Sequence, residues 1–274
     1  MTPSAVPAAI PADARVTVPR VIRAEWLRFR SLRSSLIMIA ATAAVFAALG
    51  LGFAAFLADA TVEPGTPAPP GGPSSLDPLG ASLGGVNLAQ LLIATLGVLL
   101  ITGEYSTGMI RSSLAAVPRR WPVLAGKVVV LAGVSLATLI PTVLLTFIGA
   151  QAVLGDKGIA LTGDGVLRAV LGTAGYLAGV GVLGTALGFL LRNTAAALTG
   201  AVAVLLIVPG VVALLPASWP DAIGPYLPSN AGQAFMSVTG DPGLLSPVAG
   251  AAVFTGWLAV LLAAAVTVLR RRDA

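Results

Sequence analysis

Six apolar runs, each long enough to cross a lipid bilayer, dominate this chain of 274 residues. The hydrocarbon core of a bilayer is about 30 Å thick, and a helix needs roughly 20 residues to cross it. Because no water is present there to bond backbone groups, single runs of this kind span membranes as helices. The sequence therefore predicts an all-α integral membrane protein with spans at about 36–58, 84–102, 123–151, 166–191, 195–215 and 248–269.

The composition agrees with this class and excludes several kinds of chemistry. Charged residues are 10% of the chain, whereas soluble domains carry about 25%. The chain has no cysteine and no histidine, so disulfides, thiolate metal sites and the commonest general base are excluded. It also lacks the Gly-x-x-x-x-Gly-Lys-Ser/Thr phosphate loop. We expect no catalytic, cofactor-binding or metal-binding residues, so a partner subunit would bind any ATP that drives this protein.

The basic residues predict an orientation, because Lys and Arg are retained on the cytoplasmic side of short loops. With the amino terminus inside, only Lys157 and Arg168 of the 16 basic residues fall outside, together with most of the acidic residues. We therefore expect a multi-pass protein of the cell membrane with both termini in the cytoplasm. The net charge of +5 then reflects topology rather than binding to nucleic acid.

The segment before the first span divides into two parts. Residues 1–18 are rich in Ala and Pro, carry no signal peptide and predict a disordered cytoplasmic tail. Residues 19–34 predict a basic amphipathic helix lying in the plane of the membrane interface, before a six-helix domain at 35–272. Its apolar side chains share about 140° of arc at 100° per residue: Val21, Ile22, Trp26, Phe29 and Leu32.

The alternative for residues 19–34 is a simple positive-inside anchor for span one. Glu25 lies inside the apolar arc and needs a partner, such as an arginine of another loop or subunit.

We expect two long segments to form external loops. Residues 60–83 are too rich in proline for a helix or a paired strand, so we expect a flexible exposed loop. In residues 216–247, prolines alternate with aromatic side chains that prefer an interface. This second segment is either an ordinary loop or one containing a short helix, about 230–238, that packs back against the bundle.

Glycines give span four two faces on which another helix can pack closely. One face holds Gly172, Gly175 and Gly179, and the nearly opposite face holds Gly181, Gly184 and Gly188. A glycine-lined permeation path is the alternative to close packing.

Other spans contain proline residues and side-chain amide groups within the membrane. Pro141 and Pro209 each remove a backbone hydrogen bond, so we expect bends in spans three and five. Asn87 and Gln90 are the main buried polar side chains, and either bridge helices or contact a substrate.

Residues 103–121 form a polar island between spans two and three. Glu104 continues span two, Ser106 or Thr107 can cap a new helix to about Ala116, and Pro118 ends it. This pattern predicts a short cytoplasmic helix suited to docking a protein, although a plain positive-inside loop explains the charges equally well.

Three motifs together resemble the permease subunits of type-2 ABC transporters. They are Glu25-Trp26-x-x-x-Arg30-Ser31-x-Arg33-Ser34 before span one, Gly103-Glu104-Tyr105-x-x-Gly108-Met109-Ile110-Arg111 after span two, and Pro118-Arg119-Arg120. The six spans, the internal amino terminus and the long last external loop also agree with that family. The Ala/Pro tail and the proline-rich first external loop depart from it.

The resemblance implies a connecting helix before span one and a coupling helix between spans two and three, both meeting a separate ATP-binding cassette ATPase subunit. Candidate connecting-helix contacts are Glu25 and Arg30, and candidate coupling residues are Glu104, Tyr105, Gly108, Ile110 and Arg111. A second permease chain and membrane lipids are the other implied partners, and no motif marks substrate residues.

These expectations favour the permease subunit of an ATP-driven exporter that moves an amphipathic or lipid-like substrate. The alternative is a membrane scaffold or immunity-type protein that binds a partner without pumping.

Overall fold

The computed structural model describes residues 17–59, 77–109, 121–216, 218–238 and 243–271. Within these ranges the chain forms helices and turns, and no β-strand occurs. Six helical segments are long and apolar enough to cross a membrane, which confirms the prediction of an all-helical chain with six such helices. The segments are Arg33–Asp59, Pro78–Ser106, Trp121–Lys157, Val166–Leu191, Thr194–Ala213 and Pro247–Leu269.

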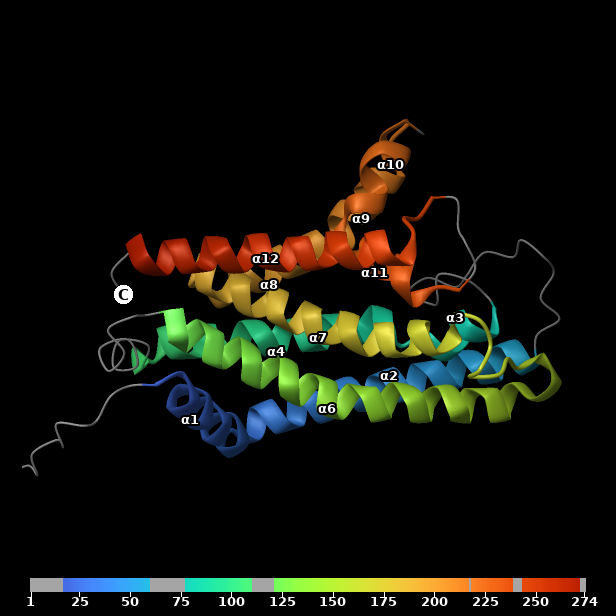
Figure 1. Cartoon of the computed structure of the whole chain (residues 1–274), viewed down its shortest axis with the longest axis horizontal. Coiled ribbons are helices and arrows are strands. Elements are labelled where there is room, and N and C mark those ends of the chain that lie inside the picture. Colours follow the sequence, from blue (N-terminus) through green and yellow to red (C-terminus); the bar gives the residue numbers. More distant parts are fainter. Residues whose placement is uncertain (1–16, 60–76, 110–120, 217, 239–242, 272–274) are drawn as a thin grey trace, which may run out of the picture.

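Figure 1 shows how the individual elements follow one another along the bundle. In order they are α1 (Val18–Ser31), α2 (Arg33–Asp59), α3 (Pro78–Leu83), α4 (Val86–Ser106), α6 (Trp121–Leu154), η1 (Gly155–Lys157), α7 (Val166–Leu191), α8 (Thr194–Val202), η2 (Ala203–Ile207), α9 (Val208–Ala213), α10 (Ser218–Ile223), η3 (Gly224–Tyr226), α11 (Pro228–Met236) and α12 (Pro247–Arg271).

Helix α7 forms the centre of the bundle. Its most apolar stretch is 83% buried, whereas the corresponding stretches of α2, α6, α8–α9 and α12 are 22%, 28%, 17% and 17% buried. Helices α4, α6, α11 and α12 pack around α7. The outer helices keep large apolar side chains exposed, among them Ile37, Leu145 and Val260. Such a surface is compatible with lipid contact.

Glycines bring α4 and α7 into backbone contact. A Cβ atom at Gly184 would collide with the carbonyl group of Ala94, and one at Gly97 would collide with the carbonyl oxygen of Gly181. In lipid, helices associate through such close packing because burial of apolar surface gives little driving force. Close packing is therefore confirmed on this face of α7.

The opposite face of α7 meets α11 and α12 in the same way. A Cβ at Gly172 would lie 2.9 Å from the carbonyl oxygen of Phe235, and one at Gly179 would lie 2.5 Å from the ring of Phe254. The rings of Phe235 and Phe254 also pack against Tyr176 of α7, with centroids 6.5 Å and 5.1 Å away. Gly172 and Gly179 of this face therefore serve packing, whereas Gly175 has no described neighbouring atom within 4 Å of its Cβ position.

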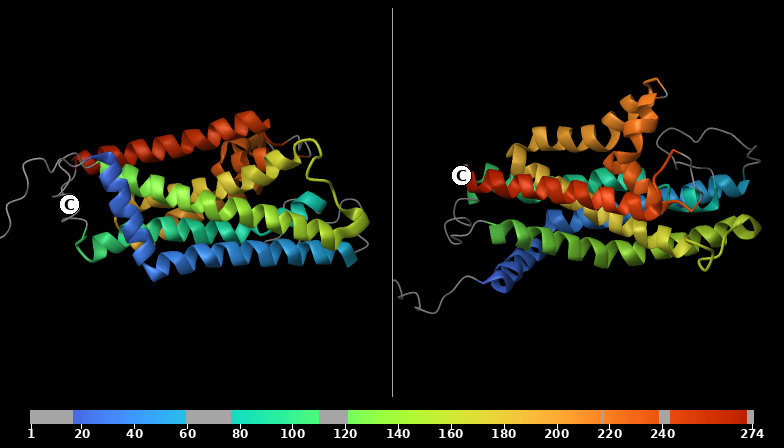
Figure 2. Two further views of the ribbon diagram at one scale, coloured as in Figure 1. Left: turned by 60° about the horizontal axis from the view of Figure 1, so that its bottom comes forward. Right: turned by 45° about the horizontal axis from the view of Figure 1, so that its top comes forward.

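Span five changes helix type in its middle. Residues Ala203–Ile207 form a π-helix, η2, which is followed directly by α9 and Pro209. A proline ring excludes the carbonyl group four residues earlier, here that of Leu205, and a wider turn relieves this clash. Figure 2 shows α9 and α10 leaving the line of α8, in agreement with the predicted bend. Pro141 lies inside α6, which is assigned as one α-helix from Trp121 to Leu154.

A single residue separates the first two helices. Leu32 has an extended conformation, with φ −85° and ψ 103°, between the end of α1 and the start of α2 at Arg33. Figure 2 shows α1 crossing the end of the bundle at a steep angle to α2. The polypeptide therefore turns sharply before it enters the first apolar span.

The prediction that residues 60–83 form only a loop is wrong for its last part. Residues 60–76 lie outside the described ranges, but Pro78–Leu83 form α3. Asp77 caps this helix by accepting a hydrogen bond from the backbone N–H of Gly80, and Pro78 occupies the first helical position, where a proline needs no N–H partner. A proline at the first position of a helix is compatible with that helix, so a high proline content alone does not exclude one here.

Helix α11 decides between the two alternatives for residues 216–247. It spans Pro228–Met236, overlapping the short helix expected at about 230–238, and it packs against α7 and α12. Arg168 of α7 donates hydrogen bonds to the carbonyl oxygens of Phe235 and Ser237 at 3.0 Å and 3.1 Å. These bonds fix the carboxyl end of α11 against the bundle.

Two alanine substitutions in α7 test the glycine contact. We expect Gly184→Ala to lower the free energy of unfolding by about 1–3 kcal/mol, because the added methyl group overlaps the backbone of α4. Gly175→Ala is the control, since no described atom lies within 4 Å of its Cβ position. It should be neutral or stabilising by up to about 1 kcal/mol, through helix propensity alone. Thermal unfolding in detergent measures both, and equal effects would contradict the proposed contact.

Candidate functional site

Three helices converge at one end of the bundle, which we call the α1 end. There, α1 packs against the first turns of α6, and the last turn of α4 lies beside them. Four charged side chains meet at this junction, and we call them the charge cluster: Glu25 and Arg28 of α1, Glu104 of α4 and Lys127 of α6. Helix α4 ends and α6 begins at this end of the bundle, so they flank residues 107–120 in the sequence.

Lys127 is the centre of the charge cluster. Its Nζ donates a hydrogen bond to Oε2 of Glu25 at 2.8 Å and another to Oε1 of Glu104. Oε1 of Glu104 also pairs with Nη1 of Arg28. The side chains of Glu104 and Lys127 are only 1% and 4% exposed, whereas those of Glu25 and Arg28 are 14% and 26% exposed. Two cations and two carboxylates therefore balance one another in a largely buried position.

The sequence explains how α1 reaches this position. Glu25 and Arg28 are three residues apart, so they share one face of α1 with the buried Val21 and Phe29. Gly126 of α6 leaves room for that face, because a Cβ atom there would lie 3.0 Å from Cγ1 of Val21 and 3.4 Å from Cγ of Glu25. The glycine beside Lys127 thus allows the two helices to approach until their charges meet.

The structure places several predicted site residues inside the protein. Glu25 pairs with Lys127 of its own chain rather than with an arginine of another loop or subunit, which corrects that expectation. Glu104 is buried in the charge cluster. The ring of Tyr105 is half-buried, with the guanidinium carbon of Arg192 5.3 Å from its centroid.

The remaining predicted residues divide into exposed and undescribed ones. Arg30 is exposed on α1. Gly108 is exposed just after α4 and has φ +71°, a left-handed conformation that favours glycine, so it gives the chain a sharp turn there. Ile110 and Arg111, with most of the predicted coupling helix, lie outside the described residues.

Sequence reasoning missed Arg28 and Lys127 as site residues. A signal for Lys127 was present, because it is an isolated cation several residues inside an apolar run. The unpartnered position of Glu25 on the apolar arc was the complementary signal. The two charges lie 102 residues apart in the chain, so only the packing of α1 on α6 shows that they pair.

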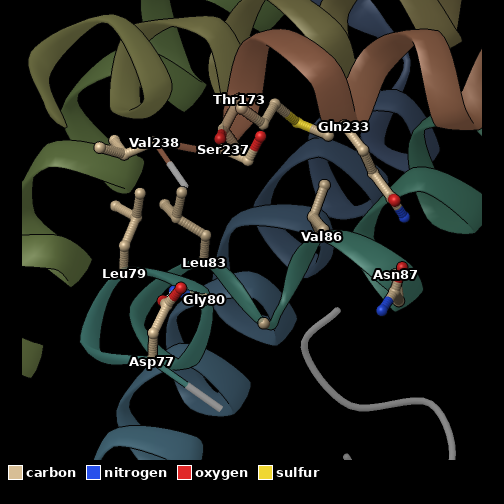
Figure 3. A pocket seen from close by; sticks show the side chains of 12 residues that line it. Asp77, Leu79, Gly80, Leu83, Val86, Asn87, Thr173, Gln233, Ser237 and Val238 are labelled. Carbon is tan, nitrogen blue, oxygen red and sulfur yellow. The ribbon is translucent and has the colours of Figure 1, made fainter. Parts of the chain in front are cut away.

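Polar side chains also gather at the opposite end of the bundle, which we call the α11 end. A pocket there lies between α3, α4, α7 and α11 (Figure 3). The amide groups of Asn87 and Gln233 lie at one end of it, away from the apolar Leu79 and Val238 at the other. Asn87 was one of the two polar candidates from the sequence.

The second polar candidate, Gln90, bridges helices. Its Oε1 accepts a hydrogen bond of 2.6 Å from the hydroxyl group of Tyr176, so it joins α4 to α7. Both side chains are buried. Bridging, one of the two roles considered for Gln90, is thus confirmed.

The described residues do not bring together three or more His, Cys, Asp or Glu side chains that could hold a metal ion. A scan against protein-family models finds no matching family, and a search of curated proteins finds no match. The charge cluster and the polar pockets are therefore the features of this chain that bear on its function.

Removing Lys127 should destabilise the fold strongly. In Lys127→Met, two carboxylates lose their shared cation, and breaking a buried ion pair from one side costs about 3–5 kcal/mol. The double variant Lys127→Met/Glu104→Leu keeps Glu25 and Arg28, one charge of each sign, and should recover at least half of that loss. Chemical denaturation in detergent, followed by circular dichroism, measures the difference.

Lys157→Met makes the same replacement at an exposed lysine on the other end of the bundle. Nζ of Lys157 donates hydrogen bonds to the carbonyl oxygens of Leu57 and Ala58 at 3.2 Å and 2.8 Å, so the substitution should lower the free energy of unfolding by about 1 kcal/mol, less than Lys127→Met. A Lys127→Met protein as stable as Lys157→Met would contradict a stabilising role for the charge cluster.

Proposed function

We propose that this chain is the transmembrane permease subunit of an ATP-binding cassette transporter of the type-2 kind, acting as an exporter. A separate cytoplasmic ATPase subunit would supply the energy, since the sequence contains no phosphate-binding loop. The observation that carries the proposal is the charge cluster, because it joins α1 to the two helices that flank segment 107–120. A protein docked on this end could move those helices together.

In this proposal α1 is the connecting helix and lies in the membrane interface. Its exposed side chains include Trp26 and Leu27 as well as Arg23 and Arg30, a mixture of apolar and basic groups suited to lipid headgroups. Its inner face carries the two charges of the cluster. Displacement of α1 would therefore act directly on Glu104 and Lys127.

Segment 107–120 would provide the coupling helix, with Arg111 as a surface contact for the ATPase. Glu104 and Tyr105 would then act from inside, by fixing the position of the helix end that precedes the segment. Gly108 would set the direction in which the chain leaves α4. This assignment gives the buried and the exposed members of the motif different tasks.

Helix α4 would transmit a displacement caused by the ATPase from the α1 end of the bundle to the α11 end. It holds Glu104 at the α1 end and Asn87 and Gln90 at the α11 end, and it is packed on α7 through glycines. In this orientation the α1 end is cytoplasmic and the α11 end faces outward in the cell membrane. A second permease chain, identical or different, would complete the pathway.

Co-purification with a cognate ATPase subunit tests the proposal. We expect the ATPase to bind this chain in lipid nanodiscs and to hydrolyse ATP faster when bound. Arg111→Glu should weaken that association about tenfold, equivalent to about 1.4 kcal/mol, without reducing membrane insertion. Glu104→Gln should retain more of the binding but lose stimulation of hydrolysis, because the link to α6 is altered.

Asp156→Lys is the matched control, a charge reversal of equal size at an exposed residue of the α11 end. It should leave ATPase binding and stimulation unchanged. Two results would favour the non-transporting scaffold instead. One is a stable partner that has no phosphate-binding loop, and the other is a rate of ATP hydrolysis that neither Arg111→Glu nor Glu104→Gln changes.

A further inference from the structure

A second cavity, of about 170 Å³, lies between α4, α7, η2, α9 and α11. It borders the pocket of Figure 3 and shares Asn87 and Gln233 with it. The cavity is large enough for several water molecules, so it has room for a polar headgroup but not for a whole lipid. Its chemistry indicates what that group is.

One side of the cavity is polar and deeply buried. Gln90 and Tyr176, 3% and 2% exposed, are held there by their mutual hydrogen bond. Ser229 of α11 also lines it, and its Oγ is buried without a hydrogen-bond partner among the described residues. A buried hydroxyl group without a partner costs about 1–3 kcal/mol, so native proteins usually satisfy such a group. Ser229 is therefore a hydrogen-bonding position that the chain itself leaves open.

The other side of the cavity is apolar and reaches the outer surface. Leu205, Leu206 and Pro209 line it, from the π-helix and the helix that follows. Leu206 is also 39% exposed on the outside of the bundle. An acyl or alkyl chain could pass this wall while its polar end stayed near Ser229. π-Helices of this kind are frequent at functional sites.

The lining side chains carry no formal charge: in the described part of the chain the cavity is bounded by amide, hydroxyl and apolar groups, with no Asp, Glu, Lys or Arg. A charged headgroup would lose its hydration there without gaining a counter-ion, which is strongly unfavourable. An uncharged group that both donates and accepts hydrogen bonds would satisfy Ser229 without this penalty.

We propose that this cavity binds the uncharged, hydroxyl- or amide-bearing headgroup of a single-chain amphipathic molecule, with Ser229 as a ligand-binding residue. The tail leaves past Leu206 towards lipid. Identification of this ligand as the exported cargo rests on the proposed function, but the binding site itself does not require an ATPase.

Photolabelling of the purified chain in phosphatidylcholine nanodiscs tests the site. The probe is a monoacylglycerol with a diazirine near its headgroup, compared with a fatty acid and an alkyltrimethylammonium that carry the same chain and diazirine. We expect saturable labelling of α11 or of residues 205–209 by the monoacylglycerol, at least about fivefold above both charged probes. Mass spectrometry of the digested protein locates the label, and unlabelled monoacylglycerol should displace it.

Two serine variants separate binding from folding. Ser229→Ala should weaken labelling about fivefold, the loss of one net hydrogen bond. Ser135→Ala is the matched control, because Oγ of Ser135 is also buried without a hydrogen-bond partner among the described residues but does not line the cavity. It should change labelling less than twofold.

Equal labelling by all three probes, no saturable label in these segments, or equal effects of the two serine variants would overturn the proposal. If the site binds the monoacylglycerol but no ATPase associates with the chain, the site stands and the proposed transport function fails. If an ATPase is stimulated but no probe is retained, the transport function stands and this site fails.

Discussion

A charged lysine in a low-dielectric environment needs a nearby counter-charge, and Lys127 has carboxylates from two helices that are distant in sequence. Glu25 brings α1 to α6, and Glu104 brings the end of α4 to the same point. None of the three elements can change position alone without separating opposite charges. The position of α1, the end of α4 and the start of α6 are all linked through this one cation.

The structure places its polar groups at the two ends of the bundle and connects them through apolar packing. Glu104 and Gln90 lie 14 residues apart on α4, which corresponds to about 21 Å at 1.5 Å per residue. Between them, Gly97 holds α4 against the backbone of α7. Since α7 also carries Tyr176 and contacts α11, the charge cluster and the two cavities belong to one continuous set of packed helices. That continuity is a physical requirement for any coupling between the ends.

Long-range features of this chain were the hardest to predict from sequence. The six apolar spans follow from length and hydropathy, and the two packing faces of α7 follow from glycine spacing, because both are properties of a single segment. Helix α3 was missed because Asp77 and Pro78 form a helix start that overall proline content conceals. The sequence shows that Glu25 needs a partner, because it lies among apolar side chains of its helix. It does not identify that partner, because pairing with Lys127 depends on how α1 crosses α6. Ser229 gave no signal in the sequence, since an unsatisfied hydroxyl group exists only relative to its neighbours in space.

The π-helix of span five has a geometric consequence for everything that follows it. A π-turn accommodates an additional residue compared with a regular α-turn, so conversion of Ala203–Ile207 to α-helix would rotate the following residues by about 100° relative to α8. Leu206 and Pro209 would then leave the side of the helix that they now occupy. A local change of helical register, with no movement of the central helices, would be enough to exchange one set of side chains on this wall for another.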